Sequence, residues 1–457
     1  MRMTISPRDM QALEQQWMRD AGVPSALLME HAAMAVYDAL SRLCTPGGTV
    51  LFLCGPGNNG GDGFAAARIW QSRGGRSRIL QLSERTSGDA EMNLRLALGL
   101  GIPSSVISDK LTRLPACDAV CDALFGTGLC REVTGEAARL IRLVNESGLP
   151  VCAVDIPSGL NGMTGRPMGC AIHAAETVTF HRLKTGLTLG ESADYTGRIT
   201  IAPILIPETY GEADGLRVLL PQELPALLPC RRPSCHKGAN GRVVILAGSP
   251  GMAGAAALCA GAAIRAGAGL TRILCRSSIL SILQVLVPGA TCTPLPEQDG
   301  VLTDEAAGIA AAALTTADAA AVGPGLGQAE DLLPLLNTFR QTACPVVWDA
   351  DALNMLASHR SLLPLKASDI ITPHPGEARR LLGDMPCFYE TDTMHGLLEL
   401  ANCRVLLKGA RTLMSDGSRF AVNITGTPAM AKGGSGDVLT GLLTGLMGQH
   451  LIQDPLT

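Results

Sequence analysis

The feature that most limits the fold of this chain is a unit that recurs in both halves: a short apolar run, a glycine-rich turn, then a helical stretch rich in alanine and leucine. Apolar runs without polar alternation are typical of strands buried on both faces, and their alternation with helices indicates parallel sheets covered on both sides. The expected strands of the first half are residues 50–54, 119–124, 151–154 and 177–180. Those of the second half are residues 243–247, 271–275, 319–322, 346–349, 370–372 and 405–407. We therefore predict an α/β protein.

The alternation of strands and helices is interrupted at residues 219–233, a stretch rich in leucine and proline without a helical or strand period. Domain boundaries fall in such stretches, and 457 residues are enough for two or three domains. We expect an N-terminal domain over residues 1–215 and a C-terminal domain over residues 225–457. The two are similar in class but are not a visible sequence repeat. At the start of the chain, Ser6 followed by Pro7 predicts a helix N-terminus, and a second helix is expected at residues 25–40.

Composition and charge exclude several classes of protein. The net charge is -4, and with 7 Phe, 4 Tyr and 3 Trp the chain has little material for stacking bases, so no nucleic-acid partner is expected. The longest uncharged stretch, residues 243–264, contains a glycine-proline turn and is interpreted as strand, loop and helix rather than a membrane span. The 15 cysteines form no Cys-x-x-Cys pair, and the nearest pairs, Cys117 with Cys121 and Cys230 with Cys235, lack further zinc ligands. We expect reduced thiols, no signal peptide and a cytoplasmic protein.

A glycine-rich segment at residues 55–63, Gly-Pro-Gly-Asn-Asn-Gly-Gly-Asp-Gly, follows the first expected strand and leads into an expected helix at residues 64–73. Glycines let the backbone approach a phosphate closely, and a helix N-terminus offers unpaired N–H groups. The segment contains the letters of the dinucleotide fingerprint, with Glu84 as a candidate ribose partner. An oxidoreductase that uses NAD(P) as cofactor is therefore one alternative, and a tight turn without a ligand is another.

Two aspartates, Asp122 and Asp155, end later apolar runs of the first half. Because the carboxyl ends of parallel strands line the ligand crevice, we expect Asn59, Asp122, Asp155 and Ser158 to converge there. One carboxylate with amide and hydroxyl oxygens suits a monovalent cation better than zinc. For either aspartate alone, a helix N-cap is the alternative.

Taken together, residues 58–63, 122–129 and 155–159 resemble the NAD(P)H-hydrate epimerase family over roughly the first 210 residues. The resemblance implies a Rossmann-like three-layer domain that interconverts the R and S epimers of hydrated NADH or NADPH. It implies a K⁺ ion held by Asn59, Asp122 and Ser158, with Asp155 as the acid or base that contacts the substrate. The substrate-binding residues that it implies are Asn58, Asn59, Gly60, Gly61, Asp62, Gly126, Thr127, Gly128, Leu129, Cys130, Arg131, Glu132 and Asp155. His31 stands where the family more usually has Asn or Arg followed by Ala-Gly, a departure on the expected dimer side; a homo-oligomer is expected.

The second half places another glycine-rich turn, residues 431–436, at an expected helix N-terminus with Asp437 in its first turn. Such a turn can stabilise an anion, and an aspartate beside a transferring phosphoryl group can accept a proton from a hydroxyl. Taken alone, this pattern is more often only a helix cap. Three other segments at strand ends, residues 323–327, 372–377 and 407–412, strengthen the site, and the second of them contains His374.

With residues 236–238 and 248–255, these segments resemble the ADP- or ATP-dependent (S)-NAD(P)H-hydrate dehydratase, a ribokinase-like fold, from roughly Arg231 to the end. The resemblance implies that Ala255, Gly325, His374 and Asp437 contact the hydrated nucleotide. It implies that Mg²⁺ accompanies ADP or ATP, which contacts Lys408, Gly409, Ala410, Arg411, Thr412 and Gly436. In this mechanism the C6 hydroxyl is phosphorylated and the phosphate then departs, with Asp437 as base and residues 433–436 as anion hole. Pro288-Gly289-Ala290 departs from the family's usual Pro-Glu.

A vitamin or sugar kinase built on the second half, with the first half as a binding module, is the remaining alternative. After the helix that begins near Asp437, the chain has only residues 449–457, whereas the family typically continues for several tens of residues. We expect Leu439, Leu442, Leu443 and Leu446 to lose packing partners as a result and the dehydratase domain to be weakened.

Overall fold

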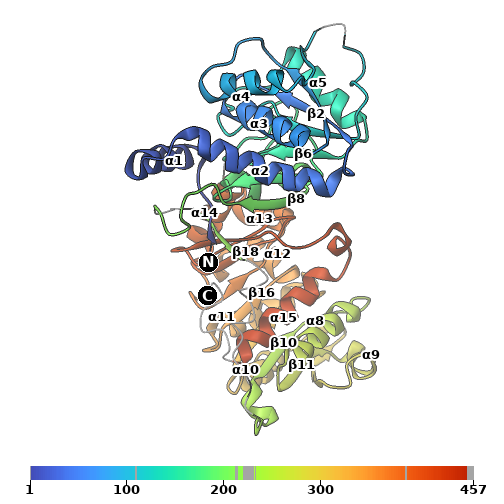
Figure 1. Ribbon diagram of the computed structural model, residues 1–457. Coiled ribbons are helices and arrows are strands. Elements are labelled where there is room, and N and C mark those ends of the chain that lie inside the picture. Colours follow the sequence, from blue (N-terminus) through green and yellow to red (C-terminus); the bar gives the residue numbers. More distant parts are fainter. Residues whose placement is uncertain are drawn as a thin grey trace. The chain divides into compact units, whose positions relative to one another are not determined.

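The computed structural model describes residues 2–108, 111–211, 215–219, 231, 233–385 and 389–449. The chain forms two compact units, Arg2–Val218 and Leu219–Thr457 (Figure 1). Most of the predicted boundary stretch, residues 220–230 and 232, lies outside the described residues, as does Cys230.

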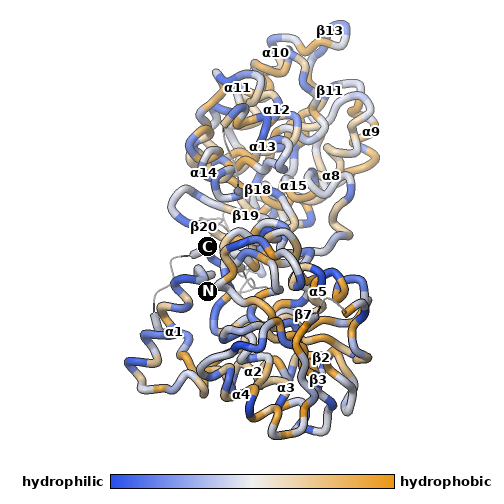
Figure 2. Tube along the Cα trace, turned by 90° about the horizontal axis from the view of Figure 1, so that it is seen from above, coloured by the Kyte–Doolittle hydropathy of each residue, from blue (hydrophilic) through white to orange (hydrophobic). Residues whose placement is uncertain are grey.

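The N-terminal unit is built on a seven-stranded parallel sheet with the order β4-β3-β2-β5-β6-β7-β8. Its strands are β2 (Thr49–Cys54), β3 (Arg76–Gln81), β4 (Ser104–Val106), β5 (Ala119–Ala123), β6 (Val151–Val154), β7 (Glu176–Phe180) and β8 (Arg198–Ala202). The short strand β1 (Arg2–Met3) pairs antiparallel with β9 (Arg217–Leu219). The four strands predicted in this half are confirmed to within one residue at each end, and β2 appears as a hydrophobic segment in Figure 2.

Helices cover both faces of this sheet. The helices of the unit are α1 (Pro7–Ala21), α2 (Ser25–Leu43), α3 (Asn58–Ser72), α4 (Gly88–Gly99), α5 (Gly135–Glu146) and α6 (Ser192–Thr196), with the 3-10 turn η1 (Thr185–Thr188). Val50 and Phe52 of β2 pack in one cluster with α1 to α4, whereas Leu51 and Leu53 pack in another with α5. This alternation is the period of two expected of a strand buried on both faces. Ser6 caps α1, as predicted.

The predicted start of α3 is wrong. The glycine-rich segment was expected to remain a loop until residue 64, but the helix begins at Asn58. The glycines serve close packing instead of a left-handed turn: a Cβ on Gly60 would lie 1.8 Å from the carbonyl oxygen of Gly55, and one on Gly63 would lie 2.6 Å from the Cβ of Ala123. The absence of side chains lets this helix lie directly against the strand ends.

The C-terminal unit has a sheet in the order β20-β19-β18-β17-β16-β15-β10-β11-β12, parallel from β18 to β12 and antiparallel from β18 to β20. Its strands are β10 (Arg242–Leu246), β11 (Leu270–Arg276), β12 (Thr291–Leu295), β15 (Ala319–Val322), β16 (Val346–Trp348), β17 (Ile370–Ile371), β18 (Arg404–Leu407), β19 (Thr412–Ser415) and β20 (Phe420–Asn423). A separate hairpin joins β13 (Glu297–Gln298) to β14 (Val301–Leu302). The six predicted strands are confirmed, whereas β12, β19 and β20 were not predicted.

The helices of this unit are α8 (Ala253–Ala266), α9 (Leu280–Leu286), α10 (Glu305–Leu314), α11 (Leu333–Gln341), α12 (Asp351–Ser358), α13 (Pro375–Leu382), α14 (Glu390–Ala401) and α15 (Ser435–Gly448). Helices α8 and α15 can approach closely because Gly441 has no side chain. A Cβ at this position would lie 2.0 Å from the carbonyl oxygen of Cys259. On α15, Leu442 is exposed, and Leu439, Leu443 and Leu446 are partly buried. Residues 450–457 lie outside the described residues.

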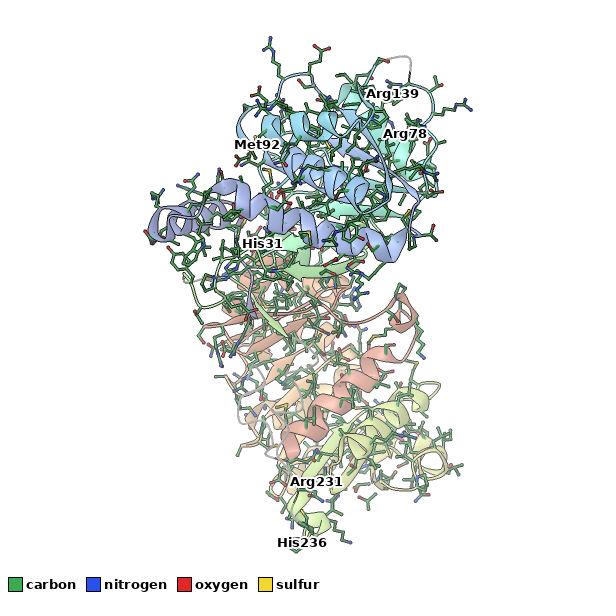
Figure 3. All side chains as sticks on the ribbon, viewed as in Figure 1. His31, Arg78, Met92, Arg139, Arg231 and His236 are labelled. Atoms are coloured by element: carbon green, nitrogen blue, oxygen red, sulfur yellow. The ribbon has the colours of Figure 1, made fainter. Side chains whose placement is uncertain are left out.

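Two sequence features lie at the surface. His31, where the sequence departs from the family pattern, is exposed on α2, and His236 is exposed just before the 3-10 turn η2 (Lys237–Asn240) (Figure 3). Among the helices of the described residues, none combines the length and the apolar character needed to cross a bilayer.

Candidate active sites

The first candidate site lies where β5 and β6 end, beside the N-terminus of α3. Asp122, the fourth residue of β5, is fully buried, and its carboxylate accepts hydrogen bonds from the backbone N–H groups of Ser158 (2.8 Å) and Leu124 (3.4 Å). Burial raises the pKa of Asp122 to about 6, against the opposing effect of these hydrogen bonds. The Ser158 hydroxyl accepts a hydrogen bond from the Phe125 N–H (2.9 Å) and lies 3.2 Å from the Phe125 carbonyl oxygen.

Asn59 completes this group from the first turn of α3. A Cβ on Gly126 would lie 3.1 to 3.3 Å from the Asn59 side-chain atoms, so the amide packs directly on the loop that Ser158 holds. Its Nδ2 atom is buried and has no hydrogen-bond partner among the described residues. The structure therefore brings Asn59, Asp122 and Ser158 to one place.

The oxygens of this group fit a cation. Among the described residues, no lysine or arginine pairs with the buried Asp122 carboxylate, and the neighbouring amide and hydroxyl oxygens are hard, neutral donors. A buried carboxylate without a counter-charge is costly, so a bound cation would stabilise it. One carboxylate with neutral oxygens matches the low charge of a monovalent ion.

Asp155 follows β6 directly and has a left-handed backbone, with φ 65°. Its Oδ1 atom accepts hydrogen bonds from the Thr179 hydroxyl (3.2 Å), the Phe180 N–H (3.2 Å) and the Lys184 ammonium (2.5 Å). The Lys184 side chain is 1% exposed, whereas that of Asp155 is 14% exposed. A residue in a left-handed conformation is rare outside glycine and persists where its surroundings hold it. Here Lys184 holds the carboxylate from the interior, and Asp155 is the partner that a ligand can reach.

Lys184 and Glu14 are candidate functional residues that the sequence analysis missed. Lys184 also donates to the Phe180 carbonyl (2.9 Å), and its backbone forms a bridge with Ile5, just before α1. Glu14 lies on α1, where burial raises its pKa to about 7; Lys184 opposes this shift and Asp155 adds to it. The only local signal was a lysine shortly after an apolar strand, and nothing in the helix pattern distinguishes Glu14 from a surface glutamate.

Asp62, predicted to bind substrate, belongs to the same charged group. Burial raises its pKa well above the ordinary value, Asp155 and Glu14 add to this, and Lys184 opposes it. The structure thus gathers three carboxyl groups and one lysine. The remaining predicted substrate residues are less closely tied to them: Asn58 and the far part of the β5–α5 loop, namely Gly128, Cys130, Arg131 and Glu132, are exposed.

The second candidate site lies where β16 and β18 end, beside the N-terminus of α15. Asp349 is 1% exposed and accepts hydrogen bonds from the Lys408 ammonium (2.7 Å) and the Thr440 hydroxyl (2.7 Å). The Lys408 nitrogen also lies 3.7 Å from a carboxylate oxygen of Glu377. A Cβ on Gly436 would lie 3.5 Å from that nitrogen, so the glycine-rich turn packs on the ion pair.

Asp437 occupies the first turn of α15, as predicted. Burial raises its pKa, Asp349 adds to the shift, and Lys408 opposes it. His374 is the N-cap of α13: its Nδ1 atom accepts from the N–H groups of Gly376 (3.0 Å) and Glu377 (3.3 Å), and Glu377 accepts from the His374 N–H (2.8 Å). The Nε2 side of the ring is thus the side left to meet a ligand, although it lies 3.4 Å from the other Glu377 oxygen.

The other predicted residues of the second site lie in two separate groups, one at Gly325 and Ala255 and one in the turn between β18 and β19. Gly325 and Ala255 touch, since a Cβ on Gly325 would lie 2.8 Å from the Ala255 Cβ. Arg411 donates to the Ile424 carbonyl (2.6 Å) and the Thr412 hydroxyl to the Gly409 carbonyl (3.3 Å), so both stabilise the turn between β18 and β19. The structure records no hydrogen bond from these two residues to Asp437 or Asp349.

Comparison with known proteins identifies the family. Two family models match the chain, one described as YjeF-related protein N-terminus over residues 25–186 and one as NAD(P)H-hydrate dehydratase over residues 243–456. The bifunctional NAD(P)H-hydrate repair enzyme Nnr of Moorella thermoacetica is 36% identical over 454 residues, which span 94% of this chain and 85% of that protein. The chain belongs to the family of bifunctional NAD(P)H-hydrate repair enzymes.

Two further proteins are similar to this chain. The Escherichia coli enzyme of the same name is 36% identical over 88% of this chain and 76% of its own. Among solved structures, the Bacillus subtilis ADP/ATP-dependent NAD(P)H-hydrate dehydratase, co-crystallized with ATP/Mg²⁺, is 31% identical and covers 53% of this chain and 83% of its own, with a TM-score of 0.44. Membership of the family favours a repair enzyme over the oxidoreductase and small-molecule kinase alternatives, and the predicted two-domain α/β class is confirmed.

Proposed function

We propose that this chain repairs hydrated NADH and NADPH in two steps. The N-terminal unit interconverts the R and S epimers, and the C-terminal unit dehydrates the S epimer with ADP or ATP. The observation that carries the proposal for the first step is Asp155, an accessible carboxylate held from the interior by Lys184 in the unit that matches the family's N-terminal model. A homo-oligomer remains a prediction.

Epimerisation needs proton transfer in both directions. Hydration leaves a hydroxyl on C6 beside the ring nitrogen; its loss as water gives an iminium ion, and addition of water to the opposite face gives the other epimer. Glu14, whose pKa lies at about 7, is partly protonated near neutral pH and gives a proton to the departing hydroxyl as the C6–O bond breaks. Asp155 takes the proton of the water that adds. Lys184 positions Asp155 and does not itself transfer a proton.

The K⁺ ion would be held by Asn59, Asp122 and Ser158. When bound, it supplies a positive charge that neutralises Asp122 and attracts the anionic substrate. The N-terminus of α3, from Asn58 to Asp62, offers backbone N–H groups and the positive end of the helix dipole to a substrate phosphate. The β5–α5 loop from Gly126 to Glu132 would close over the rest of the substrate.

Dehydration requires a better leaving group than hydroxide. Asp437 accepts the proton of the C6 hydroxyl, whose oxygen attacks the terminal phosphorus of ADP or ATP and displaces AMP or ADP. The C6–O bond then breaks with departure of phosphate, and loss of the C5 proton restores the double bond. Residues 433–436 stabilise the transferring group. Lys408 to Thr412 and Gly436 would hold the nucleotide, whose phosphates Mg²⁺ neutralises, and Ala255, Gly325 and His374 would hold the hydrated substrate.

The experiment that tests this function supplies a mixture of R and S hydrated NADH with either ADP or ATP and follows the absorbance of regenerated NADH. Full recovery is expected, because the epimerase replenishes the S form as the dehydratase consumes it. Recovery of only the S fraction would remove the epimerase assignment. Accumulation of a stable phosphorylated product would favour a kinase, and no recovery with either nucleotide would contradict the proposal.

A further inference from the structure

The C-terminal unit contains an open pocket of about 570 Å³ that the two proposed reactions leave unused. Small-molecule sites in proteins are typically about 300 to 1,000 Å³. The residues that line it are Gln328, Asn354, Ala357, Ser358 and Arg380. It adjoins the proposed substrate residues, because Gln328 follows the Gly325 loop and Arg380 lies on α13, the helix that His374 caps.

A continuous set of hydrogen bonds builds the wall of this pocket. The Asp351 carboxylate accepts from the Gly327 N–H (2.9 Å) and from the Gln328 amide (3.2 Å). The Asn354 amide lies 3.5 Å from the same carboxylate, and its oxygen accepts from Arg380 Nε (2.8 Å). The pocket is therefore a fixed extension of the glycine-rich loop that ends β15.

Arg380 is the one cation among the lining residues. Its Nε atom is used by Asn354, whereas no ion pair in the part of the chain that the structure describes joins its guanidinium to a carboxylate. The side chains of Arg380 and His374 both border Gly376: the Nη1 atom of Arg380 lies 3.8 Å, and the Cε1 atom of His374 lies 2.8 Å, from the position of a Cβ on that glycine. An arginine fork without a carboxylate partner, among amide groups, matches the geometry of a phosphate.

We propose that this pocket binds a phosphate group of the hydrated dinucleotide, with Arg380 as the contacting cation. The inference rests on the proposed dehydratase activity. The reacting ring would lie near Asp437 and His374, and the phosphates of a dinucleotide extend beyond that ring, toward the side of His374 where Arg380 lies. Two sources of phosphate share this chemistry: the pyrophosphate of both hydrated dinucleotides and the 2′-phosphate of hydrated NADPH alone.

The test compares steady-state dehydration of the S epimers of hydrated NADH and hydrated NADPH at saturating nucleotide. Arg380→Gln is expected to raise the KM for the hydrated dinucleotide about tenfold to a hundredfold, the loss of a charge-assisted hydrogen-bonded contact, with little change in kcat. An equal effect on both substrates assigns the pyrophosphate, and an effect on hydrated NADPH alone assigns the 2′-phosphate. Arg380→Lys, which keeps the charge but loses the fork, is expected to fall between Arg380→Gln and the unchanged protein.

Arg379→Gln is the matched control, since Arg379 is exposed on the same helix and does not line the pocket. It is expected to leave KM unchanged. Unchanged KM for both substrates in Arg380→Gln would overturn the inference, as would a rise in the KM for ADP or ATP alone, measured separately at saturating hydrated dinucleotide. Calorimetric titration with intact NADPH as probe measures the same contact without turnover. If the protein fails to dehydrate the substrate, the proposed function is refuted. The titration then still decides whether Arg380 binds a phosphate of the dinucleotide.

Discussion

Each candidate site contains an ion pair between a lysine and an aspartate, but the buried member of the pair differs between the two sites. In the N-terminal unit the lysine is buried and the aspartate is accessible: Lys184 is 1% exposed and Asp155 is 14% exposed. In the C-terminal unit the aspartate is buried and the lysine is accessible: Asp349 is 1% exposed and Lys408 is 20% exposed. The buried member orients its partner, so the first site presents a carboxylate and the second an ammonium. The first arrangement suits proton transfer, and the second suits an anionic phosphate.

Backbone strain accompanies both pairs. Asp155 has φ 65°, and Ala350, directly after Asp349, has φ 50°. Left-handed residues other than glycine are costly and are kept where neighbouring contacts hold them. In both units the strain lies at the carboxyl end of a parallel strand, beside the ion pair, which is where a ligand crevice is expected.

The largest expected effect separates the two sites by function. Asp155→Asn is expected to lower the rate of epimerisation by about 10² to 10⁴, the usual contribution of a general acid or base, and to leave dehydration of the S epimer unchanged. Asparagine tolerates the left-handed backbone, but the buried Lys184 ammonium loses its charged partner, so urea unfolding of the variant is measured alongside the rate. The measurement is conversion of the pure R epimer, with Asp437→Asn as the reciprocal control that loses only dehydration. Normal conversion by Asp155→Asn would remove its assigned role.

The second expected effect compares how much stability each ion pair loses when its lysine is removed. Lys408→Met leaves the buried Asp349 carboxylate with the Thr440 hydroxyl as its side-chain donor among the described residues, and breaking such a pair costs about 3 to 5 kcal/mol. Lys184→Met leaves Asp155, which still reaches water and keeps two hydrogen bonds, so the loss is expected to be smaller. Urea unfolding of both variants measures the difference. Equal losses would mean that the difference in exposure has no energetic consequence.

A third expected effect concerns the cation. Replacing K⁺ by a larger organic cation is expected to slow epimerisation about tenfold, equivalent to about 1.4 kcal/mol, and to leave dehydration of the S epimer unchanged at constant Mg²⁺. Asn59→Ala and Asp122→Ala are expected to weaken the dependence on K⁺. Full epimerase activity of the unchanged protein in K⁺-free buffer would discredit the cation site.

A fourth expected effect is on the stability of the protein as a function of pH. The pKa of Glu14 is raised, chiefly by burial, from 4.5 in the unfolded chain to about 7 in the folded one. Between these values the folded state binds more protons, so the contribution of Glu14 to the free energy of unfolding is present below pH 4.5 and is lost as pH rises to about 7. Glu14→Gln is expected to flatten this part of the curve, measured by urea unfolding over a pH series, although Asp62 acts in the same direction. An unchanged slope would show that Glu14 is solvated in the folded protein.

The chain's own pattern was enough to predict ten of the strands and the segments that end them, because a strand buried on both faces must be apolar along its whole length. It also indicated that Asn59, Asp122 and Ser158 would meet, since parallel strands end at one edge of the sheet. The start of α3 was predicted wrongly because a glycine-rich segment, taken locally, indicates a turn. Gly60 and Gly63 are instead needed because a side chain at either position would collide with Gly55 or Ala123, which only the folded sheet brings near.

Only the tertiary structure decided which charged groups share a site and which member of each pair is accessible. Lys184 and Glu14 come from opposite ends of the N-terminal unit, and Asp349 and Thr440 from distant parts of the C-terminal unit. The exposure of a side chain depends on every element packed around it, so it is a property of the fold and not of the neighbouring residues in the chain. The sequence by itself determined the α/β class and the positions of the strand-end motifs; packing determined that the first site presents a carboxylate and the second an ammonium.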